Sequence, residues 1–118
     1  MSKTIFCDID GTILSHLGDG TVQHLVGATV LPNVKKRLNE WSRKGYKLIL
    51  VTARKPSTKE ATEKQLAALG ISYDEILMGI NGQRVLINDE KPNDDAPTAL
   101  AVNLKRNKGF VGQEIENV

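Results

Sequence analysis

The sequence predicts an α/β protein built on a doubly wound, mostly parallel sheet. Short apolar runs alternate with helical patterns along the chain, which is typical of a parallel sheet with helices on both faces. With 118 residues, the chain is long enough for one core but too short for a core and a substantial second domain. We therefore expect one domain, residues 1–118, with a three-layer Rossmann-like architecture.

The first expected strand, residues 4–7, leads into two aspartates, Asp8 and Asp10, which are followed at once by Gly11 and Thr12. Two carboxylates about 5 Å apart repel by roughly 3 kcal/mol at an effective dielectric near 20. A positive group is therefore expected between them, and Mg²⁺ fits because it takes oxygen ligands and is typically held by one or two carboxylates. In phosphoryl transfer, one such carboxylate attacks while its neighbour gives and takes protons. The alternative interpretation is that both aspartates cap a turn.

The next stretch, residues 13–31, is expected to form a small hairpin or flap. It contains His16 and His24, which we interpret as surface residues or substrate contacts and not as metal ligands. A helix is then expected to begin near Pro32, a residue suited to a first helical turn. Its apolar stripe follows at spacings of four and three, at Val34, Leu38 and Trp41.

A second helix is expected to begin at a capping box formed by Ser57 and Glu60 and to end at Gly70. The run 46–51 is apolar at nearly every position, which favours a central strand covered on both faces. Further strands are expected at three short apolar runs: residues 75–78, 84–87 and 99–104.

Three polar residues, Asp8, Thr52 and Asp89, each follow an expected strand at its carboxyl end. In open parallel sheets, ligands bind beside the carboxyl ends of the strands. We therefore expect these residues to form one site.

Residues 8–12 (Asp-Ile-Asp-Gly-Thr) resemble the first motif of the haloacid dehalogenase superfamily, whose members are mostly magnesium-dependent phosphatases. Residues 48–54 (Leu-Ile-Leu-Val-Thr-Ala-Arg) resemble the second motif, and residues 85–89 (Val-Leu-Ile-Asn-Asp) the fourth. Members often carry a cap domain after the first motif or between the second and third. Neither gap can hold a large one here, so the resemblance is to the branch with no cap domain.

The resemblance implies that Asp8 is the nucleophile and Asp10 the general acid and base. It further implies that Asp8, the backbone carbonyl of Asp10, and Asp89 hold Mg²⁺. Thr52 matches the hydroxyl that donates to a phosphate oxygen, helped by the backbone amide of Ala53. The second aspartate is typical of the phosphatases in this superfamily.

The resemblance leaves two parts of the site open. Asn88 precedes Asp89 at a position where members of the superfamily often have Gly or Asp. Asp94 lies five residues after Asp89, where it either orients a metal-bound water or belongs to the polar loop 90–97. The third-motif lysine has no counterpart in the turn 79–82, although a cation is needed beside several carboxylates and a phosphate dianion. We expect Lys55 and Lys91 to be equal candidates for this role, followed by Arg54.

The composition and the absence of targeting patterns argue against nucleic-acid binding, membrane insertion and secretion. The net charge is only +2 and aromatic residues make up 4% of the chain. No signal pattern and no apolar segment of membrane-spanning length are present, and a single cysteine cannot form an internal disulfide. We therefore expect a cytoplasmic protein in which Cys7 packs in the core.

Together these features favour a magnesium-dependent phosphatase that forms an aspartyl phosphate. A small sugar phosphate is the first expected substrate, because residues 52–92 are similar to small capless phosphatases of sugar and capsule metabolism. A nucleotide or polynucleotide-end phosphatase and a binding relative with weak turnover are the alternatives. A phosphorelay receiver domain is disfavoured, since position 52 is threonine where a receiver needs aspartate. Because no cap domain is expected and the flap is short, a second copy of the chain in a homo-oligomer is expected to cover the site.

Overall fold

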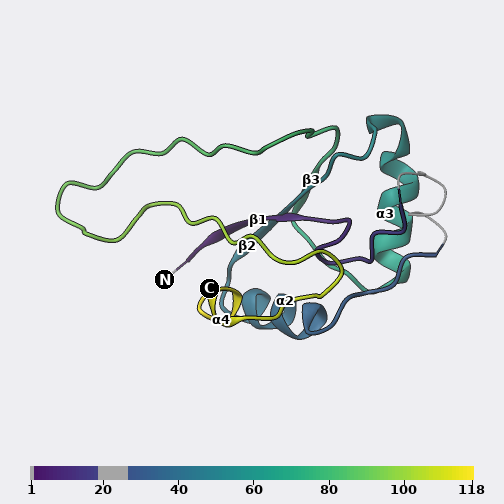
Figure 1. The fold of residues 1–118 in the computed structure, drawn as a ribbon, viewed down its shortest axis with the longest axis horizontal. Coiled ribbons are helices and arrows are strands. Elements are labelled where there is room, and N and C mark those ends of the chain that lie inside the picture. Colours follow the sequence, from purple (N-terminus) through teal and green to yellow (C-terminus); the bar gives the residue numbers. More distant parts are fainter. Residues whose placement is uncertain (1, 19–26) are drawn as a thin grey trace.

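A three-stranded parallel sheet lies at the centre of the computed structural model, which describes residues 2–18 and 27–118 (Figure 1). Its strands are β1 (Thr4–Asp8), β2 (Lys47–Val51) and β3 (Glu75–Leu77), in the order β1-β2-β3. The predicted mixed α/β architecture with a parallel sheet is confirmed.

The register of the sheet brings the ends of the strands together. Asp8 pairs with Val51, and Val51 pairs with Leu77, so the three strands end in one row. Every residue of β2 after Lys47 is buried, as predicted for a central strand. Thr52 follows directly, and therefore lies at the same edge of the sheet as Asp8.

Helix α2 (Val34–Arg43) packs its predicted stripe into the core. Val34, Leu38 and Trp41 are all buried. The helix begins two residues after Pro32, because Asn33 adopts a left-handed conformation with φ 65°. The chain leaves the helix through Gly45, whose φ of 77° is unfavourable for residues with a side chain.

Helix α3 (Lys59–Ala68) does not begin with the predicted capping box. A 3₁₀ turn, η1 (Pro56–Thr58), precedes it, and Thr58 is the N-cap without a side-chain capping bond. Because Pro56 starts this turn, Ser57 is already inside a helical segment and cannot adopt the extended conformation of a cap. The hydroxyl of Thr58 donates to the carbonyl of Lys55 at 2.8 Å.

The C-terminal segment adds helix α4 (Gln113–Glu116), an element that the apolar pattern did not predict. Its Ile115 belongs to the same core cluster as Trp41 of α2. The ring of Phe110 lies 5.6 Å from that of Trp41. The amide of Asn33 donates to the carbonyl of Phe110 at 3.3 Å. This segment therefore closes the core on the α2 side of the sheet.

The described ends of the expected flap, residues 13–31, pair with each other. Leu14 and Val30 form an antiparallel bridge, and the amide of Ser15 donates to the carbonyl of Thr29 at 2.9 Å. His24 lies outside the described residues. The paired ends place the flap directly after the first motif.

Two predicted strands, residues 84–87 and 99–104, do not form. Instead, residues 85–104 run out from the sheet as an extended segment and return to it, a segment that we call the arm (Figure 1). Apolar side chains of the arm are exposed to the following fractions: Val85 75%, Leu86 57%, Ile87 90% and Leu100 71%.

The strand prediction failed because an apolar run indicates a tendency to pair, but a strand forms only where a neighbouring strand is available. Only residues 78–83 connect β3 to the run 84–87, whereas a parallel crossover needs a dozen residues or more. In the returning limb, Val102 and Leu104 pack against the core without forming a strand. None of the helices in residues 2–18 and 27–118 has the length and apolar character needed to cross a membrane.

Candidate active site

A tight turn after β1 positions the two aspartates of the first motif. Gly11 has a φ of 86°, and its amide donates to the carbonyl of Leu14 at 2.6 Å. Glycine is favoured at this position because a side chain would be strained there. The carbonyl of Ile9 accepts from the amides of Thr12, Ile13 and Leu14. These bonds fix the turn that follows Asp8 around the fully buried Ile9.

Asp8 presents a partly exposed carboxylate with one partner on each oxygen. Its Oδ2 accepts from the hydroxyl of Thr12 at 3.1 Å, and its Oδ1 accepts from Nη1 of Arg84 at 3.2 Å. The Asp8 side chain is 33% exposed. A ligand can therefore reach this carboxylate from solvent.

Asp10, by contrast, is held by a buried arginine. Nε and Nη2 of Arg54 donate to Oδ2 and Oδ1 of Asp10 at 2.9 and 2.7 Å, and the Arg54 side chain is only 4% exposed. Nη1 of Arg54 donates to the Thr62 hydroxyl at 3.1 Å and to Oε1 of Gln65 at 2.7 Å. Thr62 and Gln65 belong to α3. The helix therefore holds the guanidinium fork of Arg54 in place, and this fork in turn holds the Asp10 carboxylate.

Thr52 lies where the sequence predicted, at the carboxyl end of β2. It is buried, and its hydroxyl oxygen accepts from the amide of Arg54 at 3.1 Å. Its amide donates to the carbonyl of Leu77 at 3.0 Å. Ala53 is exposed beside it. Thr52 and Ala53 therefore share the sheet edge of Asp8, as their predicted roles in phosphate binding require.

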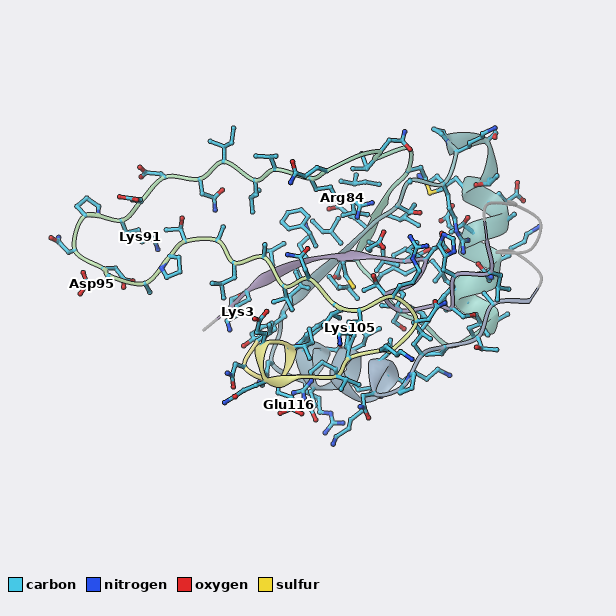
Figure 2. All side chains as sticks on the ribbon, viewed as in Figure 1. Lys3, Arg84, Lys91, Asp95, Lys105 and Glu116 are labelled. Atoms are coloured by element: carbon cyan, nitrogen blue, oxygen red, sulfur yellow. The ribbon has the colours of Figure 1, made fainter. Side chains whose placement is uncertain are left out.

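The cation on Asp8 is Arg84, a residue that the sequence reasoning missed. Its Nη2 also donates to the carbonyl of Ile80 at 3.2 Å, which places the guanidinium between the turn after β3 and Asp8. Lys55 is exposed at the start of η1. Lys91 projects from the far part of the arm, well apart from Arg84 (Figure 2). The signal that could have found Arg84 is its position two residues after the turn 79–82, close to where a third-motif cation is expected.

The remaining predicted residues, Asn88, Asp89 and Asp94, lie on the arm and are exposed. The carbonyl of Asp89 accepts from the Thr98 hydroxyl at 2.8 Å, and Oδ1 of Asp94 accepts from the amide of Ala96 at 2.9 Å. The structure therefore does not bring Asp89 to Asp8 within one chain. No group of three or more histidine, cysteine or acidic side chains in the described part of the chain is arranged to hold a metal.

The donors that are in place nevertheless suit Mg²⁺. Asp8 offers a carboxylate that is reachable from solvent, whereas the carboxylate of Asp10 binds Arg54. Mg²⁺ is typically held by one or two carboxylates together with substrate phosphate. The Asp8 carboxylate therefore fits as a protein ligand of such a site.

Cys7 precedes Asp8 in the chain but does not take part in the candidate site. Cys7 is buried in the core, and burial raises the pKa of its thiol to about 12, with the Asp8 carboxylate adding to the rise. It is therefore not a nucleophile at neutral pH.

The side chain of Asn107 exchanges hydrogen bonds of 2.6 and 3.1 Å with the backbone of His16. This pair ties the flap to the chain that returns from the arm.

A surface hollow of about 440 Å³ lies elsewhere, at the amino ends of the strands. Trp41, Tyr46, Leu48 and Asp74 are among the residues that line it. The carboxylates described above lie at the opposite ends of the strands. The hollow is therefore not part of the candidate site.

Comparisons with known proteins identify the family of the chain. A family model described as haloacid dehalogenase-like hydrolase matches residues 5–101. An uncharacterized protein of Methanocaldococcus jannaschii, MJ0015, is 40% identical over 52 residues, which cover 44% of this chain and 53% of that protein. The chain therefore matches only about half the length of this curated relative.

Two solved structures share the fold. A chain of the Pnkp1/Rnl/Hen1 complex is 30% identical with a TM-score of 0.56, covering 65% of this chain and 27% of that one. A chain of the Pnkp1/Rnl/Hen1 RNA repair complex is 26% identical with a TM-score of 0.55, covering 80% of this chain and 27% of that one. With most of its length matched by the family model, the chain belongs to the haloacid dehalogenase-like hydrolases.

Proposed function

We propose that the protein is a magnesium-dependent phosphatase that hydrolyses a phosphate monoester through an aspartyl phosphate on Asp8. The observation that carries this proposal is the unequal pair of carboxylates after β1. Asp8 is open to an incoming phosphate, whereas Asp10 is held in one orientation by the fork of Arg54. Two-step phosphoryl transfer needs this division between a nucleophile and a fixed proton donor and acceptor.

The chemistry proceeds in two displacements. In the first, a carboxylate oxygen of Asp8 attacks phosphorus, the bond from phosphorus to the ester oxygen breaks, and the carboxyl group of Asp10 gives its proton to that oxygen, which leaves as the alcohol. In the second, the carboxylate of Asp10 takes a proton from water, the water oxygen attacks phosphorus, and the bond to Asp8 breaks. When bound, Mg²⁺ would supply positive charge beside the Asp8 carboxylate and the phosphate.

The residues around this pair bind the phosphate. Thr52 and the amide of Ala53 lie at the same sheet edge and donate to its oxygens. Arg84, already 3.2 Å from Asp8, takes the part of the third-motif cation. Its guanidinium offsets the charge that the nucleophile and the phosphate bring together.

Release of inorganic phosphate with and without Mg²⁺ tests the proposal. The panel contains an aryl phosphate, sugar phosphates, mononucleotides and an oligonucleotide with a terminal phosphate. Turnover that requires Mg²⁺ is expected on at least one of them. Folded protein that binds Mg²⁺ and a phosphate analogue, but shows neither turnover nor a burst of aspartyl phosphate, would instead identify a binding relative.

Two substrate classes are distinguished by the same panel. A small sugar phosphate is the first candidate, because residues 52–92 are similar to capless phosphatases of sugar metabolism. A polynucleotide end is the second, and it is favoured by the likeness to chains of the Pnkp1/Rnl/Hen1 RNA repair complex. The class with the higher kcat/KM identifies the substrate.

Replacing Arg84 by alanine is expected to lower kcat by about 100-fold, because the transferring phosphoryl group loses a positioned charge. Arg84→Lys should retain part of the activity, since it keeps the charge but not the fork. Lys55→Ala and Lys91→Ala, measured alongside, rank the other two candidate cations. Arg43→Ala, an exposed arginine in the last turn of α2, serves as the matched control. A larger loss in either lysine variant than in Arg84→Ala would contradict the assignment.

A further inference from the structure

The arm carries an unpaired apolar segment away from the body of the protein. Val85, Leu86 and Ile87 are 57 to 90% exposed, and Leu100 on the returning limb is 71% exposed. The Cα radius of gyration is 14.7 Å, whereas a compact domain of this length is expected near about 13.5 Å. Contiguous exposed apolar side chains of this kind mark an interaction surface.

The body of the same chain offers an open sheet edge. In the described residues β1 pairs with β2 alone, so its other edge is free of a neighbouring strand. Phe6, on β1, is 54% exposed. A strand edge with unpaired amide and carbonyl groups is a template for adding a strand. The arm and this edge therefore complement each other.

The arm cannot add a parallel strand to its own β1. Arg84 binds Asp8 at 3.2 Å and the carbonyl of Ile80 at 3.2 Å, which anchors the root of the arm at the carboxyl end of β1. A parallel neighbour would have to start at the opposite end, beside Thr4. Only residues 78–83 connect β3 to this root, fewer than the dozen that a parallel crossover needs.

A second copy of the chain can supply the strand. In a parallel arrangement, residues 85–87 of one copy lie along β1 of the other, and Asp89 then reaches the carboxyl end where Asp8 and Asp10 lie. The same operation carried out twice closes a two-fold dimer. The 20 residues of the arm match the roughly 20 to 30 residues that a standard interface uses on each side.

The charges of the two surfaces are also complementary. The tip of the arm is acidic, because only Lys91 offsets four carboxylates, those of Asp89, Glu90, Asp94 and Asp95. The carboxyl end of β1 carries three arginines against the two carboxylates of Asp8 and Asp10. Arg84 binds Asp8, Arg54 binds Asp10, and the side chain of Arg106 lies against Gly11. Opposite charges of this kind favour the encounter and fix its register.

We propose that two copies exchange arms, so that residues 85–87 of each copy add a strand to β1 of the other. Asp89 of each copy thereby completes the carboxylate set of Asp8 and Asp10 in the other copy. The exchange is independent of the chemistry, whereas the part assigned to Asp89 rests on the proposed function.

Light scattering of the full chain tests the exchange. The wild type is expected to have twice the chain mass of 12.9 kDa. Ile87→Asp and Leu100→Asp are expected to be monomers with wild-type circular dichroism, because both side chains are exposed in the single chain. Val111→Asp is the matched control, since Val111 is 57% exposed but lies outside the arm. A monomeric wild type, or arm variants that remain dimers, would overturn the exchange.

Mixing two inactive variants tests the shared site. Asp8→Asn and Asp89→Asn are each expected to lack activity alone. After subunit exchange, about one quarter of wild-type activity should return, because half of the dimers are mixed and one of their two sites is intact. No recovery would overturn the shared site. A wild-type dimer that Ile87→Asp dissociates, but that releases no phosphate from any substrate, would reject the proposed function and leave the exchange in place.

Discussion

Asp8→Asn is expected to lower magnesium-dependent phosphate release by at least about 10⁴-fold, because a carboxamide cannot form the aspartyl phosphate. The fold should survive, since asparagine has the same shape and its amide oxygen can still accept from Thr12. Stabilisation by Mg²⁺ should persist in part, because that oxygen remains a metal ligand. Initial rates and thermal melting with and without Mg²⁺ measure the three effects.

The control for Asp8→Asn is Glu116→Gln, which removes one exposed carboxylate from α4, far from the site (Figure 2). It should keep wild-type activity. Activity of Asp8→Asn within tenfold of the wild type, in protein free of wild-type contamination, would show that Asp8 is not the nucleophile.

Arg54→Met is expected to destabilise the protein by about 3 to 5 kcal/mol, because it leaves the carboxylate of Asp10, whose side chain is only 16% exposed, without its partner. For a domain of this size, this corresponds to a fall in Tm of about 10 to 20 °C. Activity should also fall by about 100-fold in the folded fraction, because Asp10 loses its fixed orientation. Thermal unfolding by circular dichroism, with kcat measured well below the lowered Tm, separates the two losses.

The same substitution at an ion pair within one helix provides the control for Arg54. Arg37 donates to Glu40 at 2.9 Å within α2, where the two side chains are 19% and 31% exposed, and Arg37→Met should cost only about 0.5 kcal/mol. Arg54→Lys should rescue little, because one ammonium group cannot replace the four hydrogen bonds of the guanidinium to Asp10, Thr62 and Gln65. Equal Tm values for Arg54→Met and Arg37→Met would show that the buried fork does not stabilise the fold.

Much of the fold could be predicted because its signals are local. The stripe of α2 repeats with the period of a helix, and β2 reads as a central strand because it is apolar at four consecutive positions. The start of α3 was predicted wrongly, because Pro56 forms a 3₁₀ turn through Ser57, the residue that the capping pattern placed at the N-cap. A short apolar run such as 84–87 is a weaker predictor of a strand, since strand formation depends on a pairing partner that is distant in sequence.

In the candidate site, too, residues of one short motif could be predicted, whereas contacts between distant residues could not. Asp8 and Asp10 could be located from the sequence, because both lie in one short motif after one strand. The contact between Arg84 and Asp8 could not, because the two residues are 76 positions apart in the sequence. Arg54 was ranked third among candidate cations for phosphate, and the structure instead shows it bound to Asp10 across 44 positions.

The parallel α/β architecture and the family could be predicted from the sequence, as could the placement of Asp8 and Thr52 at the ends of β1 and β2, with Asp10 two residues beyond β1. These features follow from hydrophobic periodicity and from motifs that are continuous in the chain. Which cation faces each carboxylate, and the departure of residues 85–104 from the sheet, could be seen only in the folded chain. An ion pair or a strand pairing depends on where two distant segments meet. That meeting is set by connection lengths and packing, which a local pattern does not contain.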